Sequence, residues 1–398
     1  MKHTLIVLLS LAAAGSLLAN GTRLPSQDDL TVARGYADVA TAGNASAVYY
    51  NPAGLTQLGT AEFDDGIYVL TPRVSYVSTT GASSSESNQT FVLPHGFAAV
   101  PLGAFNGGHA VVGLGLYSPF GLSSDWPQTS GFRTLATKNS IRYVTGALSI
   151  AVPVLPGLSL GGSLQYNQQH DNLNRGIGIV QGDNFHFDGV GSAYSYAIGL
   201  LWQPAKEHSF GVNFQSKASF NLSGNVNLTP FGTTYPGSAY WAYPEDITVG
   251  YSYRPTPEWN LEADWDWTDW RVLKTVVLTS SVAPPTSLPF NWQASSYANF
   301  GGTRTWSNGW SASAGVSISA NSVPEADFNP SLVDVSRVLY NLGPGYSYGN
   351  WTLQTVFQFS PTVTRTVSGT PPSQAGESAN GTYRSRLWAA GFDIRYRL

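Results

Sequence analysis

Apolar and polar side chains alternate along SFGVNFQSKASFNL, residues 209–222. One parity is apolar and holds Phe210, Val212, Phe214, Ala218, Phe220 and Leu222. The other parity carries mainly Asn, Gln, Lys and Ser side chains. Because successive side chains of a β-strand point to opposite faces, this period of two predicts a strand with one apolar and one polar face.

The same alternation recurs along the chain. In residues 310–319, Trp, Ala, Val and Ile alternate with Ser and Gly. About fourteen such segments fit between residue 66 and the C-terminus, a pattern typical of an outer-membrane β-barrel. The last segment, Phe392 to Leu398, alternates to the chain end. It can pair with the first strand, and this closure removes the exposed edges of the sheet.

The composition also favours a membrane-spanning barrel. Charged residues make up only 11% of the chain, against about 25% in average soluble proteins, and aromatic residues reach 13%. No apolar run after residue 19 is long enough for a transmembrane helix. The net charge of −4 gives no argument for nucleic-acid binding, and the absence of Cys excludes a disulfide framework. We therefore expect the outer membrane of a Gram-negative-type bacterium.

Residues 1–19 have the pattern of a secretory signal peptide. Lys2 and His3 form a short polar start, and the following residues up to Ala19 are apolar and small. We expect cleavage near Ala19, so that the mature chain begins at about Asn20.

Residues 20–60 do not alternate, and short helices are expected there. Ser26 and Asp29 have the spacing of a capping box, which predicts a helix that ends near Gly35. A further turn or two of helix fits residues 45–50, because Asn51-Pro52 cannot continue it.

The stretch YYNPAGL, residues 49–55, combines a turn with apolar flanks. Asn, Pro and Gly suit positions i, i+1 and i+3 of a type I turn, whereas the Tyr and Leu side chains need burial. A fourteen-stranded barrel has a lumen wider than its own side chains fill. We therefore expect an all-β fold: a membrane-spanning antiparallel barrel over residues 61–398, with residues 20–60 as a hatch inside the lumen.

The chain also resembles a known family. ARGYADVATAGNASAVYYNPAGLTQL, residues 33–58, is similar to the N-terminal signature of the outer-membrane long-chain fatty acid transporters, the FadL family. YSPFGLSSDWP at residues 117–127, with FR at 132–133, resembles the exit of its third strand and its long extracellular loop. Residues 243–270 and 323–343 resemble its later strands and loops. The similarity covers nearly the whole mature chain.

The resemblance implies a function in transport. Members of the family are fourteen-stranded barrels with an N-terminal hatch that carry hydrophobic compounds, here most directly long-chain fatty acids. The cargo would be captured by the extracellular loops, move to a pocket beside the hatch, and leave sideways through the barrel wall. Two departures are visible: the chain ends in Leu398 rather than in an aromatic residue, and its long loops are modest in length.

Candidate ligand-binding residues form two groups. Beside the hatch we expect Tyr49, Tyr50, Asn51, Pro52, Ala53, Gly54 and Leu55, for which anchoring the hatch is an equal alternative. At the loop mouth, apolar and cationic side chains would capture an acyl chain and its carboxylate. These candidates are Phe120, Leu122, Trp126, Phe132, Arg133, Leu135, Lys138 and Arg142. A solvated loop above an aromatic girdle is the alternative reading of this second group.

The expected partners follow from the same reading. They are hydrophobic small molecules (fatty acids or hydrocarbons), outer-membrane lipid and lipopolysaccharide, and the barrel-assembly machinery, with no nucleic acid. We expect a monomer. No cofactor and no metal are expected, because the six His residues show no ligand spacing.

Other functions have weaker support. Two GxSxG matches, at residues 157–161 and 345–349, lie in a strand and a turn rather than in a nucleophile elbow, so we expect no enzyme. The acidic ladder Glu262, Asp264 and Asp266 is expected to line the lumen and to pair with Arg254 or Lys217. An open diffusion porin for small polar solutes, an outer-membrane barrel lipase and a loop-mediated adhesin are the alternatives; a porin would need no hatch.

Overall fold

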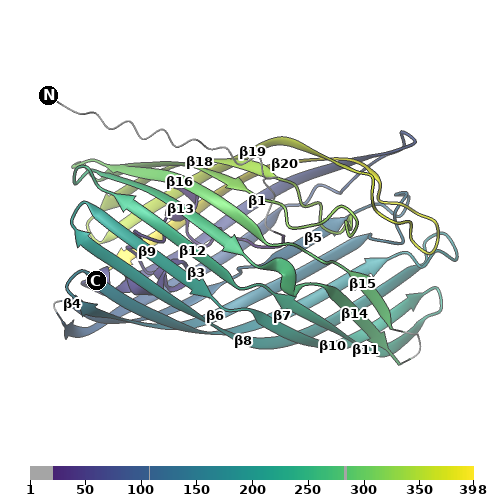
Figure 1. The fold of residues 1–398 in the computed structure, drawn as a ribbon, viewed down its shortest axis with the longest axis horizontal. Helices are drawn as coiled ribbons and strands as arrows, with labels where there is room; N and C mark the ends of the chain where they lie inside the picture. Colours follow the sequence, from purple (N-terminus) through teal and green to yellow (C-terminus); the bar gives the residue numbers. More distant parts are fainter. Residues whose placement is uncertain (1–20, 107, 282–284) are drawn as a thin grey trace.

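The computed structural model describes residues 21–106, 108–281 and 285–398. Its strands belong to one sheet, which is rolled into a closed antiparallel barrel of fourteen crossing strands (Figure 1). The prediction of an all-β barrel of about fourteen strands is confirmed. The predicted signal peptide, residues 1–19, lies outside the described residues.

Most crossing strands are continuous and long. They are β1 (Glu62–Ser78), β3 (Phe91–Phe105), β6 (Lys138–Leu155), β7 (Leu158–Arg175), β8 (Asn184–Ala205), β17 (Trp310–Ser319), β18 (Arg337–Tyr348), β19 (Trp351–Val367) and β20 (Gly381–Arg397). A short strand, β2 (Ser83–Ser85), extends β1 into a hairpin. The barrel closes where β1 pairs with β20, from Glu62 opposite Arg397 to Ser78 opposite Gly381. Closure pairs the backbone groups that hydrocarbon could not satisfy.

The remaining crossing strands are each interrupted once. The pieces are β4 (Gly108–Tyr117) and β5 (Gly121–Asp125), β9 (His208–Gln215) and β10 (Ala218–Thr229), β11 (Thr233–Tyr243) and β12 (Asp246–Tyr253), β13 (Trp259–Thr268) and β14 (Thr275–Ser280), and β15 (Thr286–Pro289) and β16 (Ser295–Thr305). Four of the interruptions lie side by side, because Gln215 pairs with Asp246, Asp246 with Thr268, and Thr268 with Ser295.

At this line of interruptions, the apolar side chains of the strands change from the outer side of the wall to the lumen side. In β9, Phe210 and Val212 are exposed on the outer wall, whereas Phe220 and Leu222 of β10, which share their parity, are fully buried inside. The same change occurs on the neighbouring strands. Outer-wall residues below the line include Val249, Tyr251, Leu261, Trp265 and Phe300, and buried residues above it include Trp241, Tyr243, Val276, Leu278, Phe290 and Trp292.

One sequence expectation is therefore wrong. Residues 209–222 do not form one strand with a single apolar face, because residues 216–217 reverse which parity points outward. After β10 the barrel continues as the hairpin of β10 and β11. Above the membrane the outer wall meets water and the lumen is apolar, so the polarity pattern of these strands is the reverse of the pattern below.

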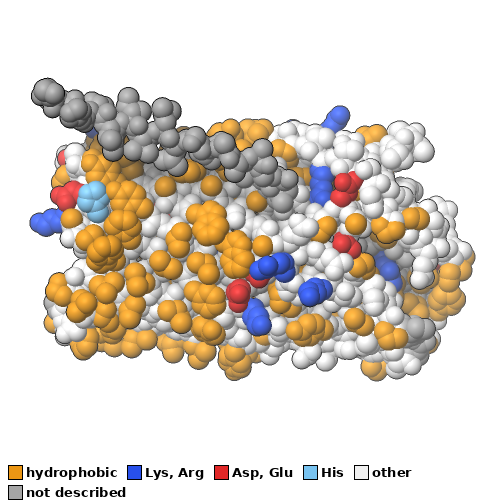
Figure 2. Space-filling model, viewed as in Figure 1, with side chains coloured by type: hydrophobic (Ala, Val, Ile, Leu, Met, Phe, Trp, Pro, Cys, Tyr) orange, Lys and Arg blue, Asp and Glu red, His pale blue; other side chains and the backbone are white. Residues whose placement is uncertain are grey.

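The two ends of the barrel differ. Short turns join the strands at the end that holds the C-terminus, and longer segments, including residues 321–336 and 368–380, join them at the other (Figure 1). Short turns are periplasmic and long loops extracellular in bacterial barrels. Hydrophobic side chains gather on the left-hand part of the wall in Figure 2, the part nearer the C-terminal end.

The helices are short and mostly lie near the N-terminus. They are α1 (Asp29–Ala33), α2 (Ala47–Tyr50), η1 (Pro52–Gln57) and η2 (Trp270–Val272). In the part of the chain that the structure describes, no helix is long and apolar enough to cross a membrane.

The outward apolar band makes a prediction about stability. Phe357 of β19 is 63% exposed on the outer wall, and we expect Phe357→Arg to destabilise the barrel by about 2–4 kcal/mol, because it brings a cation into hydrocarbon. Tyr348→Arg, at the strand end, should cost at most about 1 kcal/mol. Reversible urea unfolding from lipid vesicles measures both, and equal losses would contradict this placement of the membrane.

Candidate ligand-binding site

Residues 21–60, here called the N-terminal segment, contain two short helices, α1 and η1, whose N-termini are capped by side chains. The carboxylate of Asp28, not Ser26, caps α1 by accepting the N–H of Thr31 at 2.7 Å, so the capping box expected from Ser26 and Asp29 is wrong. The hydroxyl of Ser26 instead hydrogen-bonds the hydroxyl of Tyr36 at 2.9 Å. Asn51 caps η1 by accepting the N–H of Ala53 at 3.1 Å.

The N-terminal segment contacts the inner wall on several sides. Helix α1 contacts β17, β18, β19 and β20, and η1 contacts β4, β6, β7 and β8. Val48 and Leu55 are fully buried. The segment therefore lies in the lumen, in the half of the barrel nearer the periplasm.

The Asn-Pro-Ala-Gly turn rests on a pair of wall glycines. Gly161 of β7 and Gly199 of β8 face each other, and a Cβ at Gly161 would overlap the backbone of Pro52 and Ala53. The side-chain amide of Asn51 donates to the carbonyls of Val39 at 2.7 Å and Leu200 at 3.0 Å. The last glycine of the first GxSxG match is Gly161, and its missing side chain lets the turn pack directly on the wall.

The acidic ladder of β13 binds the N-terminal segment. Arg34 donates to Glu262 at 2.8 Å, and Arg23 donates to Asp266 at 2.6 Å. Asp264 accepts the backbone N–H groups of residues 38 and 39, at 2.8 and 3.0 Å. The ladder does line the lumen, but the expected partners Arg254 and Lys217 are not the ones that pair with it. The buried carboxylates instead hold two arginines of the segment.

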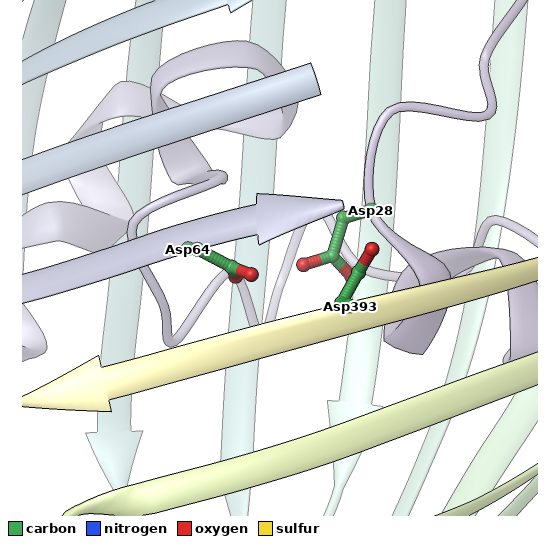
Figure 3. A group of neighbouring side chains, drawn as sticks. All are labelled: Asp28, Asp64 and Asp393. Atoms are coloured by element: carbon green, nitrogen blue, oxygen red, sulfur yellow. The ribbon is translucent and has the colours of Figure 1, made fainter. Parts of the chain in front are cut away.

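A second charged cluster fastens the segment to the closing strands. Asp28, Asp64 of β1 and Asp393 of β20 bring carboxylate oxygens within 4.8 Å of one another (Figure 3). Such a group could hold a cation, and here Arg395 supplies one: its guanidinium lies 3.1 Å from Asp28 and 2.7 Å from Asp64. His95 contacts Asp393 at 2.8 Å.

Asp29 lies beside this cluster, and among the described residues no cationic side chain pairs with it. It is fully buried, and neither carboxylate oxygen has a hydrogen-bond partner. Burial, followed by the charges of Asp393, Asp28 and Asp64, raises the pKa of Asp29 to about 10. The carboxyl group is therefore neutral at physiological pH.

A break in the wall adjoins the segment. The β3–β4 ladder ends at Gly96 opposite Leu116, and the described residues give β5 no ladder partner except β6. The N-terminal segment covers the break from inside. Leu24 donates its N–H to the carbonyl of Pro119 at 2.8 Å, and the side chain of Gln27 exchanges two hydrogen bonds with the backbone of Ser118, at 2.8 and 3.1 Å.

An apolar pocket lies in the extracellular half of the lumen. Its lining comes from segments far apart in the sequence and includes Leu122, Leu135, Ile141, Leu173, Phe185, Trp241, Leu278, Leu288, Phe290, Trp292 and Leu332. Its free space is about 50 Å³. Small-molecule pockets hold roughly 300–1,000 Å³, so a ligand could enter only if the lining moved apart.

One cation reaches this pocket. Arg175, at the end of β7, lines it, and its guanidinium lies 5.2 Å from the ring centroid of Phe185. Among the described residues no carboxylate forms an ion pair with Arg175. The pocket thus combines apolar walls with one uncompensated positive charge, an arrangement that suits an amphipathic anion.

The apolar loop-mouth candidates lie at or near this pocket. Phe120, Trp126 and Phe132 are buried in the extracellular core, where the indole of Trp126 donates to the carbonyl of Pro330 at 2.9 Å. Leu122 and Leu135 line the pocket itself. The structure therefore brings all five candidates into one half of the lumen.

The cationic candidates are placed differently. Arg133 donates to Asp183 at 2.7 Å, and Asp183 also accepts N–H groups from residues 177–180, which orders that loop. Lys138 is exposed, 3.8 Å from Asp125. Arg142 is exposed on the outer parity of β6, whereas its neighbours Ile141 and Tyr143 are buried inside. None of the three is among the residues that line the pocket.

The candidates beside the hatch also form two groups, one that lines a cavity and one that packs on the barrel wall. Tyr49 and Tyr50 line a small polar cavity of about 30 Å³ with Arg23 and Asp266. Residues 51–55 pack on the wall, with Leu55 against the backbone of Gly113.

Sequence reasoning missed Arg175 and most of the pocket wall. Trp241, Phe290 and Trp292 are not among the residues expected from the sequence to contact the ligand, although they are buried in the lumen. A local signal existed, because Pro244 and the residues around 290–294 interrupt the alternation. The side that each piece faces, however, depends on pairing with strands distant in the sequence.

Fold and site together define an outer-membrane transport barrel with a filled lumen. A sequence profile described as "Outer membrane protein transport protein (OMPP1/FadL/TodX)" matches residues 10–398. The chain belongs to this family, and it is located in the outer membrane. NMB0088 of Neisseria meningitidis serogroup B, described as an outer membrane protein, is 24% identical over 88% of this chain and 87% of its own.

Solved structures share the fold. A Pseudomonas aeruginosa FadL homologue superposes with a TM-score of 0.83 at 17% identity, over 95% of this chain and 99% of its own. The Ralstonia pickettii toluene transporter TbuX gives 0.72 at 18%, over 93% and 98%, and the P. putida toluene transporter TodX gives 0.70 at 15%, over the same shares.

The glycine pair under the turn makes a second prediction. We expect Gly161→Val to displace the N-terminal segment, because the added side chain would occupy the space of Pro52 and Ala53. Gly162→Val is the matched control, since a Cβ there meets only the carbonyl of Ala197 at 3.9 Å. Uptake of a large polar antibiotic should rise in the first variant and stay unchanged in the second. Equal uptake in both would contradict the packing argument.

Asp29 makes a third prediction, about pH. Its carboxyl group ionises near pH 4 when solvated, but its pKa in the folded protein is about 10. Between these values the opened segment binds fewer protons, so opening of α1 should become easier as pH rises, by up to roughly tenfold per unit. Asp29→Asn should remove this slope.

Hydrogen exchange of the α1 amides, corrected for intrinsic rates, measures the opening. Asp65→Asn is the control, because Asp65 lies on the outer wall one residue from Asp64. An unchanged slope in Asp29→Asn would show that another group titrates.

Proposed function

We propose that this protein carries hydrophobic compounds across the outer membrane, with long-chain fatty acids as the principal cargo. The observation that carries the proposal is the apolar extracellular pocket with the cation of Arg175 at its wall. An acyl chain gains about 0.8 kcal/mol for each CH₂ that leaves water, and the guanidinium would hold the carboxylate. The family assignment agrees with transport rather than catalysis.

The route we propose has three stages. The cargo enters the apolar pocket between the loops, and the closed lining moves apart to admit it. It then reaches the N-terminal segment, which acts as a hatch, near Tyr49 and Tyr50. It leaves through the break between β3 and β5, where the segment makes its hydrogen bonds to Ser118 and Pro119. An apolar cargo favours this sideways exit because the membrane is its preferred solvent.

Monoaromatic hydrocarbons are the second candidate cargo. Two structural neighbours are toluene transporters, and the pocket is small and rich in aromatic side chains. A hydrocarbon has no carboxylate, so it would not need Arg175. The two cargoes can therefore be separated by a single substitution.

The test compares uptake of radiolabelled oleate and toluene by cells that lack their own transporter. Arg175→Gln should lower oleate uptake by roughly tenfold, the loss of one charge-assisted contact, and leave toluene uptake unchanged. Lys138→Gln, which removes an exposed cation at the same end of the barrel, is the control and should change neither.

Other outcomes would revise the proposal. Loss of both substrates in Arg175→Gln would indicate a structural role for the arginine. Oleate uptake equal to that of the wild type would contradict recognition of an acid. Uptake of sugars but of neither substrate by the wild type would favour an open diffusion porin.

A further inference from the structure

Three arginines gather on the outer wall where the barrel closes. The register of β1 and β20 places Arg73 directly opposite Arg386, and Ser75 opposite Arg384. Arg384 and Arg386 are exposed and Arg73 is half-buried, whereas Tyr76 and Tyr383, on the other parity of the same strands, are buried in the lumen. All three arginines therefore point away from the lumen.

Among the described residues, no acidic side chain compensates these charges. Within the described residues, no ion pair joins any of the three to a carboxylate. Arg73 donates only to backbone carbonyls, those of Pro72 at 2.9 Å and Gln89 at 3.1 Å. On the other side of β20, Arg384 faces Thr364, which is neutral. Like charges directly opposite on one face of a sheet are destabilising, so a bound anion would relieve the repulsion between Arg73 and Arg386.

The position of the three arginines along the barrel axis, relative to the membrane, indicates which anion they would meet. Two residues from Arg386 toward the periplasm, Trp388 packs on Phe359 with ring centroids 4.2 Å apart. Phe392 and Ile394 continue the exposed apolar band below. Aromatic girdles mark the membrane interface, so the arginines lie at the head-group level of the outer leaflet.

We propose that Arg73, Arg384 and Arg386 bind a phosphate group of the phosphorylated glycolipid that forms the outer leaflet. Guanidinium groups match phosphate oxygens with paired hydrogen bonds, and three of them can share one phosphate. The acyl chains of the same lipid would lie against Trp388 and Phe392. The lipid would bridge β1 and β20, the strands whose pairing closes the barrel. This site is independent of the transported cargo and rests only on the outer-membrane location.

The test uses the full-length barrel, purified and stripped of lipid in detergent. Native mass spectrometry would follow binding of lipid A carrying both phosphates and of the same lipid after enzymatic removal of the phosphates. The wild type should bind the phosphorylated form more tightly by roughly tenfold. The double variant Arg384→Gln/Arg386→Gln should bind both forms equally weakly. Arg304→Gln is the matched control, because Arg304 is also exposed but lies toward the other end of the barrel, and it should behave as wild type.

Several results would contradict binding of the glycolipid phosphate. Equal binding of both lipids by the wild type, or undiminished binding by the double variant, would overturn the proposal. Complete competition by inorganic phosphate at low concentration would replace the glycolipid with a free-phosphate site. Heat-modifiable gel mobility checks that each barrel is folded, and Arg73→Gln gives the same comparison if the double variant does not fold.

Discussion

A barrel in hydrocarbon must pair every backbone group internally and present an apolar outer wall. Below the line from Gln215 to Ser295, the outer wall of these strands is apolar, as hydrocarbon requires. Above the line their outer wall is polar and meets water, and their apolar side chains face the lumen. The aligned interruptions let four neighbouring strands exchange faces together. An apolar lumen at the extracellular end is the feature that separates this barrel from an aqueous pore.

The N-terminal segment is held by charge on two parts of the wall. Arg23 and Arg34 pair with the ladder of β13, while Asp28 reaches Arg395 on β20. Removing one member of a buried ion pair destabilises a protein far more than replacing both members with apolar residues, because the remaining charge is left buried without a partner. A position of the segment that separated these pairs would carry the same cost, so the pairs favour one position. Burial and the neighbouring carboxylates raise the pKa of Asp29, which favours a neutral carboxyl group in this acid-rich part of the lumen.

The segment also connects the lumen to the wall. Its first residues supply the backbone partners that Ser118 to Gly121 lack between β4 and β5. A cargo that moved this segment would therefore uncover the break in the same step. In the route that we propose, passage from the pocket to the lipid would then need no continuous aqueous path.

A barrel of about fourteen strands could be predicted from the sequence, because period-two alternation and composition are local properties. The burial of Tyr49 and Leu55 could be predicted from their apolar side chains beside the Asn-Pro-Ala-Gly turn. The sequence also placed the acidic ladder in the lumen. Three features follow only from the folded barrel: the side that each strand piece faces, the pairing of the ladder with Arg23 and Arg34, and the position of Arg175 at the pocket. The reason is physical: a two-residue interruption exchanges the faces of a strand, and partners more than two hundred residues apart are set by closure of the whole sheet, not by any local pattern.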